Sequence, residues 1–316
     1  MNILVTGGRG YLGGRLCEFL FRHTKHAVRY ISRSRQGHAG SPVLMVVSDW
    51  ESEESLRACC MGVDVIVHLA AMNAIECAAD PVAALIVNAV ATTRLLEAAK
   101  KEKVRRFVYL STAHVYGSPL MGHISEATWP QPIHPYATSH RAAEDGVIAA
   151  DRQGQIEGLV LRLSNAFGAP ANPAANCWDL LFNDLCRQAI IDKALVLRSS
   201  GLQRRDFMPL TDVCRAITHL AELPLGSSTP RLFNVGGDWA PTVWEAANLI
   251  ADRVEIRIGY RTPLKRVQPR NGETATDLVY QTNLLSSTGF RLQADRMAEL
   301  DDLLAFCERE FGVKRD

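Results

Sequence analysis

The sequence lacks an excess of charge of either sign. Its 35 lysines and arginines nearly balance 34 aspartates and glutamates, so the formal net charge is only +1. Proteins that bind nucleic acid or an acidic membrane surface through their overall field carry a marked basic excess, which is missing here. An anionic ligand would therefore have to be held by a few local cations.

The spacing of a metal site or a disulfide framework is also missing. The cysteines form no CxxC pair and have no histidine at metal-ligand spacing, so we expect neither a bound metal nor a disulfide framework. Such scatter is typical of a reduced, cytoplasmic protein. The eight cysteines are Cys17, Cys59, Cys60, Cys77, Cys177, Cys186, Cys214 and Cys307.

A leader segment and a membrane-spanning run are further features that the sequence does not show. Met1 is followed by the apolar residues 3–5 with no basic segment before them. We find no apolar stretch near the roughly 18 residues that a spanning helix needs. We therefore expect a protein that is neither secreted nor inserted in a membrane.

The composition instead predicts a large folded core. The 316 residues are 47% hydrophobic and 22% charged, which excludes a disordered chain. This length accommodates one large α/β core, or a main domain with a smaller one attached.

Strand and helix patterns alternate through the first half of the chain. Short apolar runs rich in β-branched residues predict buried parallel strands, and the segments between them have helical periodicity. This alternation predicts an α/β fold with a doubly wound parallel sheet, the Rossmann type. The expected strands lie at 2–6, 27–32, 43–47, 63–69, 107–111 and 158–163, and the expected helices at 12–21, 53–60, 82–101 and 137–150.

The organisation changes after about Asn165, where a loop rich in proline, alanine and asparagine begins at Gly168. We predict a cofactor-binding domain over residues 1–165. Residues 166–316 are expected to form mainly a smaller, mixed substrate-binding domain. Some later segments, such as 231–235, are expected to return to the main sheet.

Three glycines stand directly between the first strand and the first helix. Gly7 permits a tight turn, Gly10 lets backbone amides approach a pyrophosphate, and Gly13 allows the helix to pack closely on the strand. The helix N-terminus adds partial positive charge. We therefore predict that this turn, with Tyr11 and Leu12, binds a dinucleotide.

The residues after the second strand indicate which dinucleotide is bound. NAD-binding domains usually carry an acidic residue there that accepts hydrogen bonds from the ribose hydroxyls. The sequence has Arg33 and Arg35 instead, and arginine binds phosphate through two parallel hydrogen bonds. We predict NADP, with NAD less favoured; the alternative is that both arginines belong to a solvated turn.

Three later segments complete a resemblance that spans essentially the whole chain. The GxxGxxG turn, residues 67–71, residues 111–117 and the segment from Tyr136 to His140 resemble the extended short-chain dehydrogenase/reductase family, in its nucleotide-sugar epimerase, dehydratase and reductase branch. The resemblance implies that Asp49 and Trp50 contact the adenine, although Asp49 could simply cap the following helix. It also places three further residues at the cofactor, namely Leu69, Ala70 and Ala71.

The same resemblance implies a catalytic set with one departure. In the family a hydroxyl residue and a tyrosine hydrogen-bond the sugar oxygen, and a lysine four residues after the tyrosine binds the nicotinamide ribose. Thr112 and Tyr136 match the first two, but His140 stands at the lysine position. Histidine is mostly neutral at pH 7. Three alternatives follow. His140 replaces the lysine, either protonated or donating a hydrogen bond to the ribose, or another cation replaces the lysine. In the third, the protein binds NADP without turnover, as a sensor or scaffold.

The residues after Thr112 bear on the reaction type. Dehydratases of the branch carry an Asp-Glu pair there, whereas this chain has Ala113 and His114, so dehydration is disfavoured. His114 occupies the place of a proton-shuttling cysteine in some reductases, and Cys177 lies in a loop that could also face the sugar. Arg33 and Arg35 favour a 4-keto-sugar reductase that consumes NADPH, with a 4-epimerase as the alternative.

The second half of the chain has candidates for binding a nucleotide diphosphate sugar. Asn165, Arg205 and Arg270 match family segments that contact the diphosphate, and two guanidiniums would neutralise much of its charge. The alternatives are a salt bridge from Arg205 to Asp206 or Asp212 and a plain surface position for Arg270. The base and the sugar are not readable from the residues.

Two helices are rich in alanine on more than one face. They span 82–101 and 137–150, and small residues permit close contact between helices. In the resembled family these helices form a four-helix dimer interface, so we expect a homodimer; burial within one subunit is the alternative.

Overall fold

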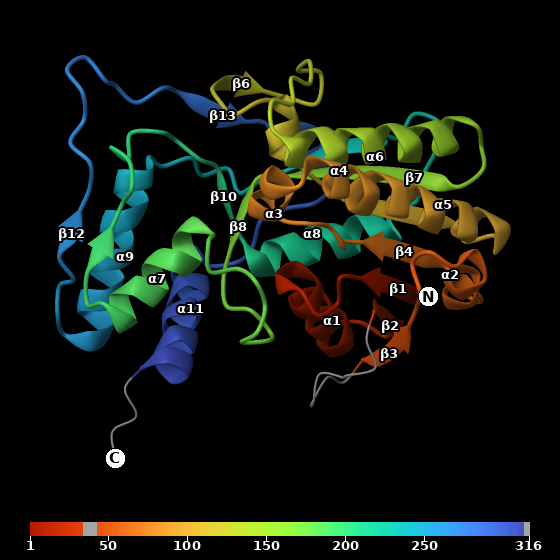
Figure 1. The fold of residues 1–316 in the computed structure, drawn as a ribbon, viewed down its shortest axis with the longest axis horizontal. Coiled ribbons are helices and arrows are strands. Elements are labelled where there is room, and N and C mark those ends of the chain that lie inside the picture. The colour runs from red at the N-terminus through yellow and green to blue at the C-terminus, as the bar shows by residue number, and fades with distance from the viewer. Residues whose placement is uncertain (34–42, 313–316) are drawn as a thin grey trace.

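The computed structural model describes residues 1–33 and 43–312. A seven-stranded parallel sheet forms its centre, in the order β11-β7-β5-β4-β1-β2-β3 (Figure 1). The predicted α/β fold with a doubly wound sheet is confirmed. Its strands are β1 (Asn2–Thr6), β2 (Ala27–Ser32), β3 (Leu44–Val47), β4 (Val65–His68), β5 (Arg106–Thr112), β7 (Glu157–Leu163) and β11 (Leu232–Val235).

Helices cover both faces of the sheet because successive strand residues point to opposite sides. Ile3 and Val5 of β1 belong to a core that includes residues of α1 (Tyr11–His23) and α8 (Leu210–Glu222), whereas Leu4 belongs to the core on the other face. The helices of that second face are α2 (Glu53–Cys60), α5 (Ala91–Lys101) and α6 (Pro135–Arg152).

The predicted elements of the first half agree closely with the structure. The bounds of β1, β2 and α2 are those expected, and the remaining predicted elements differ by one or two residues at an end. The expected return of residues 231–235 to the sheet is also found, because β11 pairs with β7 as an edge strand.

A third core lies beside the sheet, on the left in Figure 1. It is built by α7 (Leu181–Ile191), α9 (Val243–Ile258) and α11 (Arg296–Phe311). The remaining short elements are the strand pairs β8 (Asn165–Phe167) with β10 (Phe207–Pro209), β9 (Leu195–Val196) with β12 (Leu264–Lys265) and β6 (Gly122–Ile124) with β13 (Leu278–Tyr280), and the helices α3 (Ala74–Ala79), η2 (Ala113–Tyr116) and α10 (Asn283–Ser287).

One continuous helix runs from Pro81 to Lys101. It consists of α4 (Pro81–Ala84), a π-helical turn η1 (Leu85–Val90) and α5. By length and composition alone it could cross a membrane, contrary to the expectation that no such stretch exists. Its inner face carries the buried polar residues Asn88 and Thr92, which hydrogen-bond within the protein.

Candidate active site

The glycine turn has the close packing that its sequence predicts. Gly7 has φ of 69°, and a Cβ there would lie 3.0 Å from the amide nitrogen of Ala70. A Cβ on Gly13 would lie 2.1 Å from the carbonyl oxygen of Gly7, so only glycine fits that helix position. Gly10 is the N-cap of α1 and gives it no side-chain cap. The first amides of α1 are therefore free of a side-chain acceptor and suited to a phosphate.

Hydrogen bonds bring the end of β4 onto this turn. The Thr6 hydroxyl accepts from the amides of Leu69 and Ala70, each at 3.0 Å, and lies 2.6 Å from Nδ1 of His68. Ala71 follows as an exposed residue. The strand order reverses between β1 and β4, which is where open α/β sheets bind their ligands.

Tyr11 and Leu12 point their side chains into the protein. The buried Tyr11 hydroxyl donates to the carbonyl of Gly168 at 3.0 Å, and burial raises the pKa of this phenol. Leu12 packs, partly buried, against the core that α1 shares with α8. The expected cofactor role of both residues would therefore fall to their main chain.

The adenine end of the crevice is only partly described. Arg33 directly follows β2 and is exposed, whereas Arg35 lies outside the described residues. Asp49 accepts a hydrogen bond from the amide of Glu51, but Ser52 caps α2, so the capping alternative for Asp49 is wrong. The half-buried ring of Trp50 lies 5.9 Å from the ring of His68.

Thr112 and Tyr136 come together at the carboxyl end of β5. Thr112 ends that strand, and Tyr136 lies in the first turn of α6. Burial raises the pKa of Tyr136 to about 12; the nearby Cys77 adds to this, and the nearby Thr112 hydroxyl opposes it. The two hydroxyls can therefore address one substrate oxygen.

His140 lies one helical turn after Tyr136. The two rings meet edge to face with centroids 4.5 Å apart. The imidazole is buried, with Nδ1 2.7 Å from the hydroxyl of Tyr109, while Nε2 has no partner within the described chain. Burial, aided by His114, lowers the pKa of His140 to about 4. This lowered pKa favours a neutral imidazole near pH 7, and the three alternatives for His140 stay predictions.

A buried ion pair fixes α6 against the sheet. Glu144 accepts from Arg162 at 2.6 Å and 2.9 Å and from the Ser111 hydroxyl at 2.5 Å. Closer to the N-terminus of α6, Asn88 donates to the Ser139 hydroxyl at 2.9 Å. These contacts set the register in which α6 presents its catalytic face.

Arg205 is available for an anionic ligand. Neither Asp206 nor Asp212 pairs with it; Asp206 accepts from Ser164 and two main-chain amides, and Asp212 pairs with Arg215. The salt-bridge alternative for Arg205 is therefore wrong. Burial lowers the pKa of the Arg205 guanidinium.

The Arg205 guanidinium lies near His114. Burial lowers the pKa of His114, and the charge of Arg205 lowers it further, which indicates that the two side chains are neighbours. Asn165 of β8 donates through its amide to the carbonyl of Asp206 at 2.9 Å, beside Arg205. That Thr112, His114, Asn165 and Arg205 belong to one substrate site stays a prediction.

Arg270 stands apart from this group. It lies exposed on the loop before β13, where Glu273 accepts from its main-chain amide at 2.9 Å and from the Ser200 hydroxyl. Within the described chain, no hydrogen bond or ion pair joins Arg270 to Asn165 or Arg205. Its expected contact with the diphosphate stays a prediction.

The residues present fit a nicotinamide dinucleotide. The glycine turn leaves no room for side chains, α1 has no side-chain cap, and the buried Nε2 of His140 lacks a partner. A group that accepts one hydrogen bond at His140 and places phosphates at α1 would satisfy all three.

Residues 3–236 match the NAD dependent epimerase/dehydratase family. The chain belongs to this family. It is 30% identical over 270 residues to YtcB of Bacillus subtilis, described as an uncharacterized UDP-glucose epimerase, with 80% of this chain and 82% of the relative covered. It is 29% identical over 282 residues to UDP-glucuronic acid decarboxylase 6 of Arabidopsis thaliana, covering 83% and 78%.

Solved structures agree with this membership. MoeE5 in complex with UDP-glucose and NAD is 25% identical, with a TM-score of 0.78 over 99% of this chain and 100% of that one. TunA, an NAD dependent NDP-hexosamine 5,6-dehydratase, is 25% identical, with a TM-score of 0.80 over 100% and 98%. This epimerase/dehydratase family member is thus an NAD(P)-dependent enzyme of the extended short-chain dehydrogenase/reductase type.

The surroundings of Thr112 in this family member hold no acid and base pair for water loss. Ala113 is buried, and His114 is an imidazole with a lowered pKa. Cys177 does not face the site as expected, because it is 2% exposed, packs with Asn183, and burial raises the pKa of its thiol to about 12. The role of Tyr136 in proton transfer stays a prediction.

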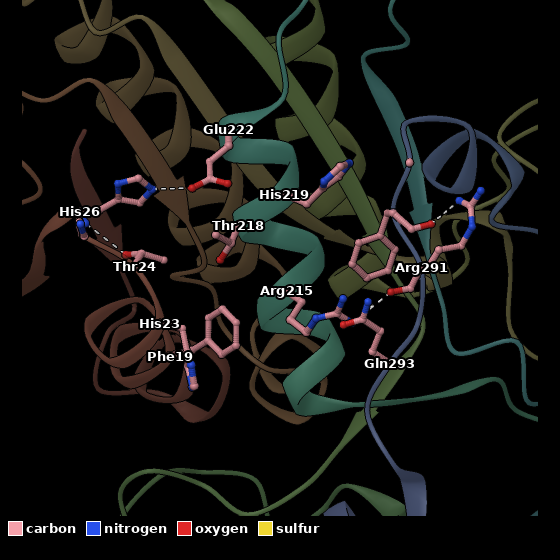
Figure 2. Close-up of a pocket in the computed structure, with 13 residues that line it drawn as sticks. Phe19, His23, Thr24, His26, Arg215, Thr218, His219, Glu222, Arg291 and Gln293 are labelled. Carbon is pink, nitrogen blue, oxygen red and sulfur yellow. Dashed lines mark hydrogen bonds and ion pairs between the residues drawn. The ribbon is translucent and has the colours of Figure 1, made fainter.

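A separate groove of about 440 Å³ lies between α1, α8 and the loop before α11 (Figure 2). It lies toward the amino ends of the sheet strands, away from the carboxyl ends that carry Thr112. Arg106, the first residue of β5, donates there to carbonyls at the end of α8. Two of the side chains that line it, His26 and Glu222, already bond to each other at 2.7 Å. The groove is therefore not part of the site of this family member.

Proposed function

We propose that the protein is an NADP-dependent 4-keto-sugar reductase that acts on a nucleotide diphosphate sugar. The observation that carries this proposal is that Thr112 and Tyr136 lie close together at the carboxyl end of β5, without a carboxylate at the two positions after Thr112. This set of groups suits hydride and proton transfer at one carbinol carbon. It does not suit the elimination of water.

Each residue then has one task. Tyr136 donates a proton to the sugar oxygen, and Thr112 holds that oxygen by a hydrogen bond. His140 donates from Nε2 to a hydroxyl of the nicotinamide ribose. Arg205 binds the diphosphate, and Asn165 holds the segment just before β10 that carries Arg205. Bound NADPH would supply the hydride.

The preference for NADP rests on the residues after β2. Ser32 and Arg33 stand where NAD-binding domains usually have an acidic residue, and Arg33 is exposed with no ion pair among the described residues. A guanidinium attracts a 2′-phosphate, whereas a carboxylate would repel it.

A 4-epimerase is the second candidate, favoured by the relative in Bacillus subtilis that is described as a UDP-glucose epimerase. An epimerase would use the same Thr112 and Tyr136 but would return the hydride to the other face of the sugar. The cofactor would then be recycled rather than consumed.

The experiment starts from purified protein stripped of cofactor. NADPH and NADH are titrated by fluorescence, and UDP-linked 4-keto sugars are added while the absorbance of the reduced cofactor is followed. Oxidation of NADPH supports the reductase. Interconverted sugars without net oxidation support the epimerase, and tighter binding of NADH contradicts the role given to Arg33. Tyr136→Phe is the matched control, because it should bind NADPH and lose turnover.

We also propose that a second copy of the chain covers the helix from Pro81 to Lys101. Four large apolar side chains on it are exposed, with Val82 at 68%, Ile86 at 50%, Leu85 at 44% and Val90 at 43%. Their spacing of three and four residues places them on one helix face. Burying such a stripe between two copies removes apolar surface from water.

Light scattering after size exclusion tests this interface. Ile86→Glu should convert the dimer into a monomer, whereas Ile256→Glu, on the exposed face of α9, should leave the dimer intact. A monomeric native protein, or equal effects of both substitutions, would contradict the proposed interface.

A further inference from the structure

Tyr109 is the one hydrogen-bonding partner of His140 within the described chain. It lies on β5 and is 2% exposed, and its hydroxyl is 2.7 Å from Nδ1 of His140. Its ring lies between two imidazoles, with centroids 5.7 Å from His68 and 5.8 Å from His140. No other hydrogen bond of the Tyr109 hydroxyl is found among the described residues.

The direction of this hydrogen bond follows from the lack of another acceptor. If His140 donated from Nδ1, the hydroxyl proton of Tyr109 would be buried without an acceptor, which is unfavourable. If Tyr109 donates, both groups are satisfied. A neutral imidazole has one proton, so donation from Tyr109 leaves that proton on Nε2 of His140.

Nε2 of His140 is buried and has no hydrogen-bond partner among residues 1–33 and 43–312. Proteins seldom leave a buried donor unpaired, and a persistent exception indicates a ligand that completes the bond. The unpaired atom belongs to a residue whose ring touches Tyr136, the proton-transfer residue of the proposed site.

We propose that Tyr109 is a positioning residue that fixes His140 as the Nε2–H tautomer, so that a neutral imidazole donates a hydrogen bond to the nicotinamide ribose. This inference rests on the proposed cofactor binding. In this proposal two residues together take the place of the family's lysine, because the phenol of Tyr109 on β5 sets the tautomer of His140. The remaining polar neighbours do not set it, since His68 bonds Thr6 and Thr92 instead.

The first test reads the tautomer directly and does not depend on activity. In protein labelled with ¹⁵N-histidine, long-range proton–nitrogen spectra should show His140 protonated at Nε2 and bare at Nδ1. In Tyr109→Phe the spectra should show a mixture of both tautomers. Tyr280→Phe is the matched control, because Tyr280 is also a buried phenol that donates away from His140, to the carbonyl of Arg162 at 2.8 Å. Tyr280→Phe should retain the native tautomer.

The second test measures cofactor affinity in the same proteins. Tyr109→Phe should weaken NADPH binding about fivefold, which corresponds to about 1 kcal/mol, the worth of one hydrogen bond. In a His140→Gln background, where no tautomer exists, Tyr109→Phe should cause no further loss. Equal losses in both backgrounds would assign Tyr109 a merely structural role.

The outcomes separate this inference from the proposed function. A native His140 protonated at Nδ1, or a Tyr109→Phe protein that keeps the pure Nε2–H form, overturns the role of Tyr109 even if the wild type reduces sugars. A native protein with the Nε2–H tautomer that binds no NADPH contradicts the cofactor proposal and leaves the tautomer assignment standing.

Discussion

Replacing His140 with lysine should lower the pKa of Tyr136 and increase the rate of sugar reduction near neutral pH. In the native protein burial raises the pKa of Tyr136 to about 12, and the adjacent imidazole, with a pKa of about 4, carries no charge that would oppose this. Tyr136 is therefore a weak general acid at pH 7. A lysine would place a cation beside the phenol and favour the phenolate.

The size of the effect follows from the separation of the two rings, 4.5 Å between centroids. With an effective dielectric constant of about 20, a unit charge at that distance stabilises the phenolate by roughly 4 kcal/mol, which is close to 3 pKa units. The pKa of Tyr136 should then fall to about 9. Burial disfavours a charged lysine, so this shift is an upper limit.

Two measurements check this prediction. The alkaline limb of the pH–rate profile for NADPH oxidation should move from about 12 toward about 9. Ultraviolet titration of tyrosinate should show the same shift, and Tyr136→Phe should remove it. His140→Gln, which is neutral, should leave the limb in place. A folded lysine variant with an unmoved limb would refute the reasoning.

Three further predictions concern stability and substrate binding. Burial lowers the pKa of His68 to about 3 and of His140 to about 4. As pH falls below ~6.5, the unfolded chain therefore binds protons at these two imidazoles that the folded chain does not bind. The free energy of unfolding should drop by about 4 kcal/mol between pH 7 and pH 5, as measured by urea titrations. Arg162→Met removes two hydrogen bonds from the buried Glu144 carboxylate and leaves it the partly exposed Arg141 as its cationic partner, so the substitution should cost about 3 kcal/mol by the same titrations. Arg205→Ala should raise KM for the nucleotide sugar about tenfold or more, with the Kd for NADPH unchanged, in steady-state kinetics and fluorescence titration.

Each of these has a control. His140→Gln should remove somewhat less than half of the pH dependence, and a dependence that stays whole would contradict the buried neutral state of this imidazole. Adding Glu144→Gln to Arg162→Met should restore part of the lost stability, because the buried negative charge of the Glu144 carboxylate is then removed. Arg204→Ala, next to Arg205 but bonded to the carbonyl of Ala240, should leave KM unchanged. Equal effects of Arg204→Ala and Arg205→Ala would contradict a specific diphosphate contact.

The sequence predicted the features that depend on neighbouring residues. Short apolar runs rich in β-branched residues and period-3.6 patterns located the strands and helices of the first half to within two residues, and the glycine spacing located the turn between β1 and α1. The resemblance pointed to Thr112 and Tyr136, which the fold brings together. These features are local because steric limits on the backbone act within a few residues.

The sequence did not reveal how charged and polar groups pair over long distances. Tyr109 reads as one more apolar position in a buried strand, and its bond to His140, 31 residues away, has no signal in the chain. Cys177 was expected to face the sugar and is instead packed in the core. Only the structure shows that Arg205 forms no ion pair with Asp206 or Asp212, because both carboxylates bond to other groups.

The sequence by itself thus determined the doubly wound sheet, the dinucleotide turn and the absence of a lysine beside Tyr136. Only the tertiary structure decided that His140 is neutral, which of its nitrogens is unpaired and which arginine is available to a phosphate. The physical reason is that protonation and pairing depend on burial and on the distances between groups, and packing brings together groups that the chain keeps far apart.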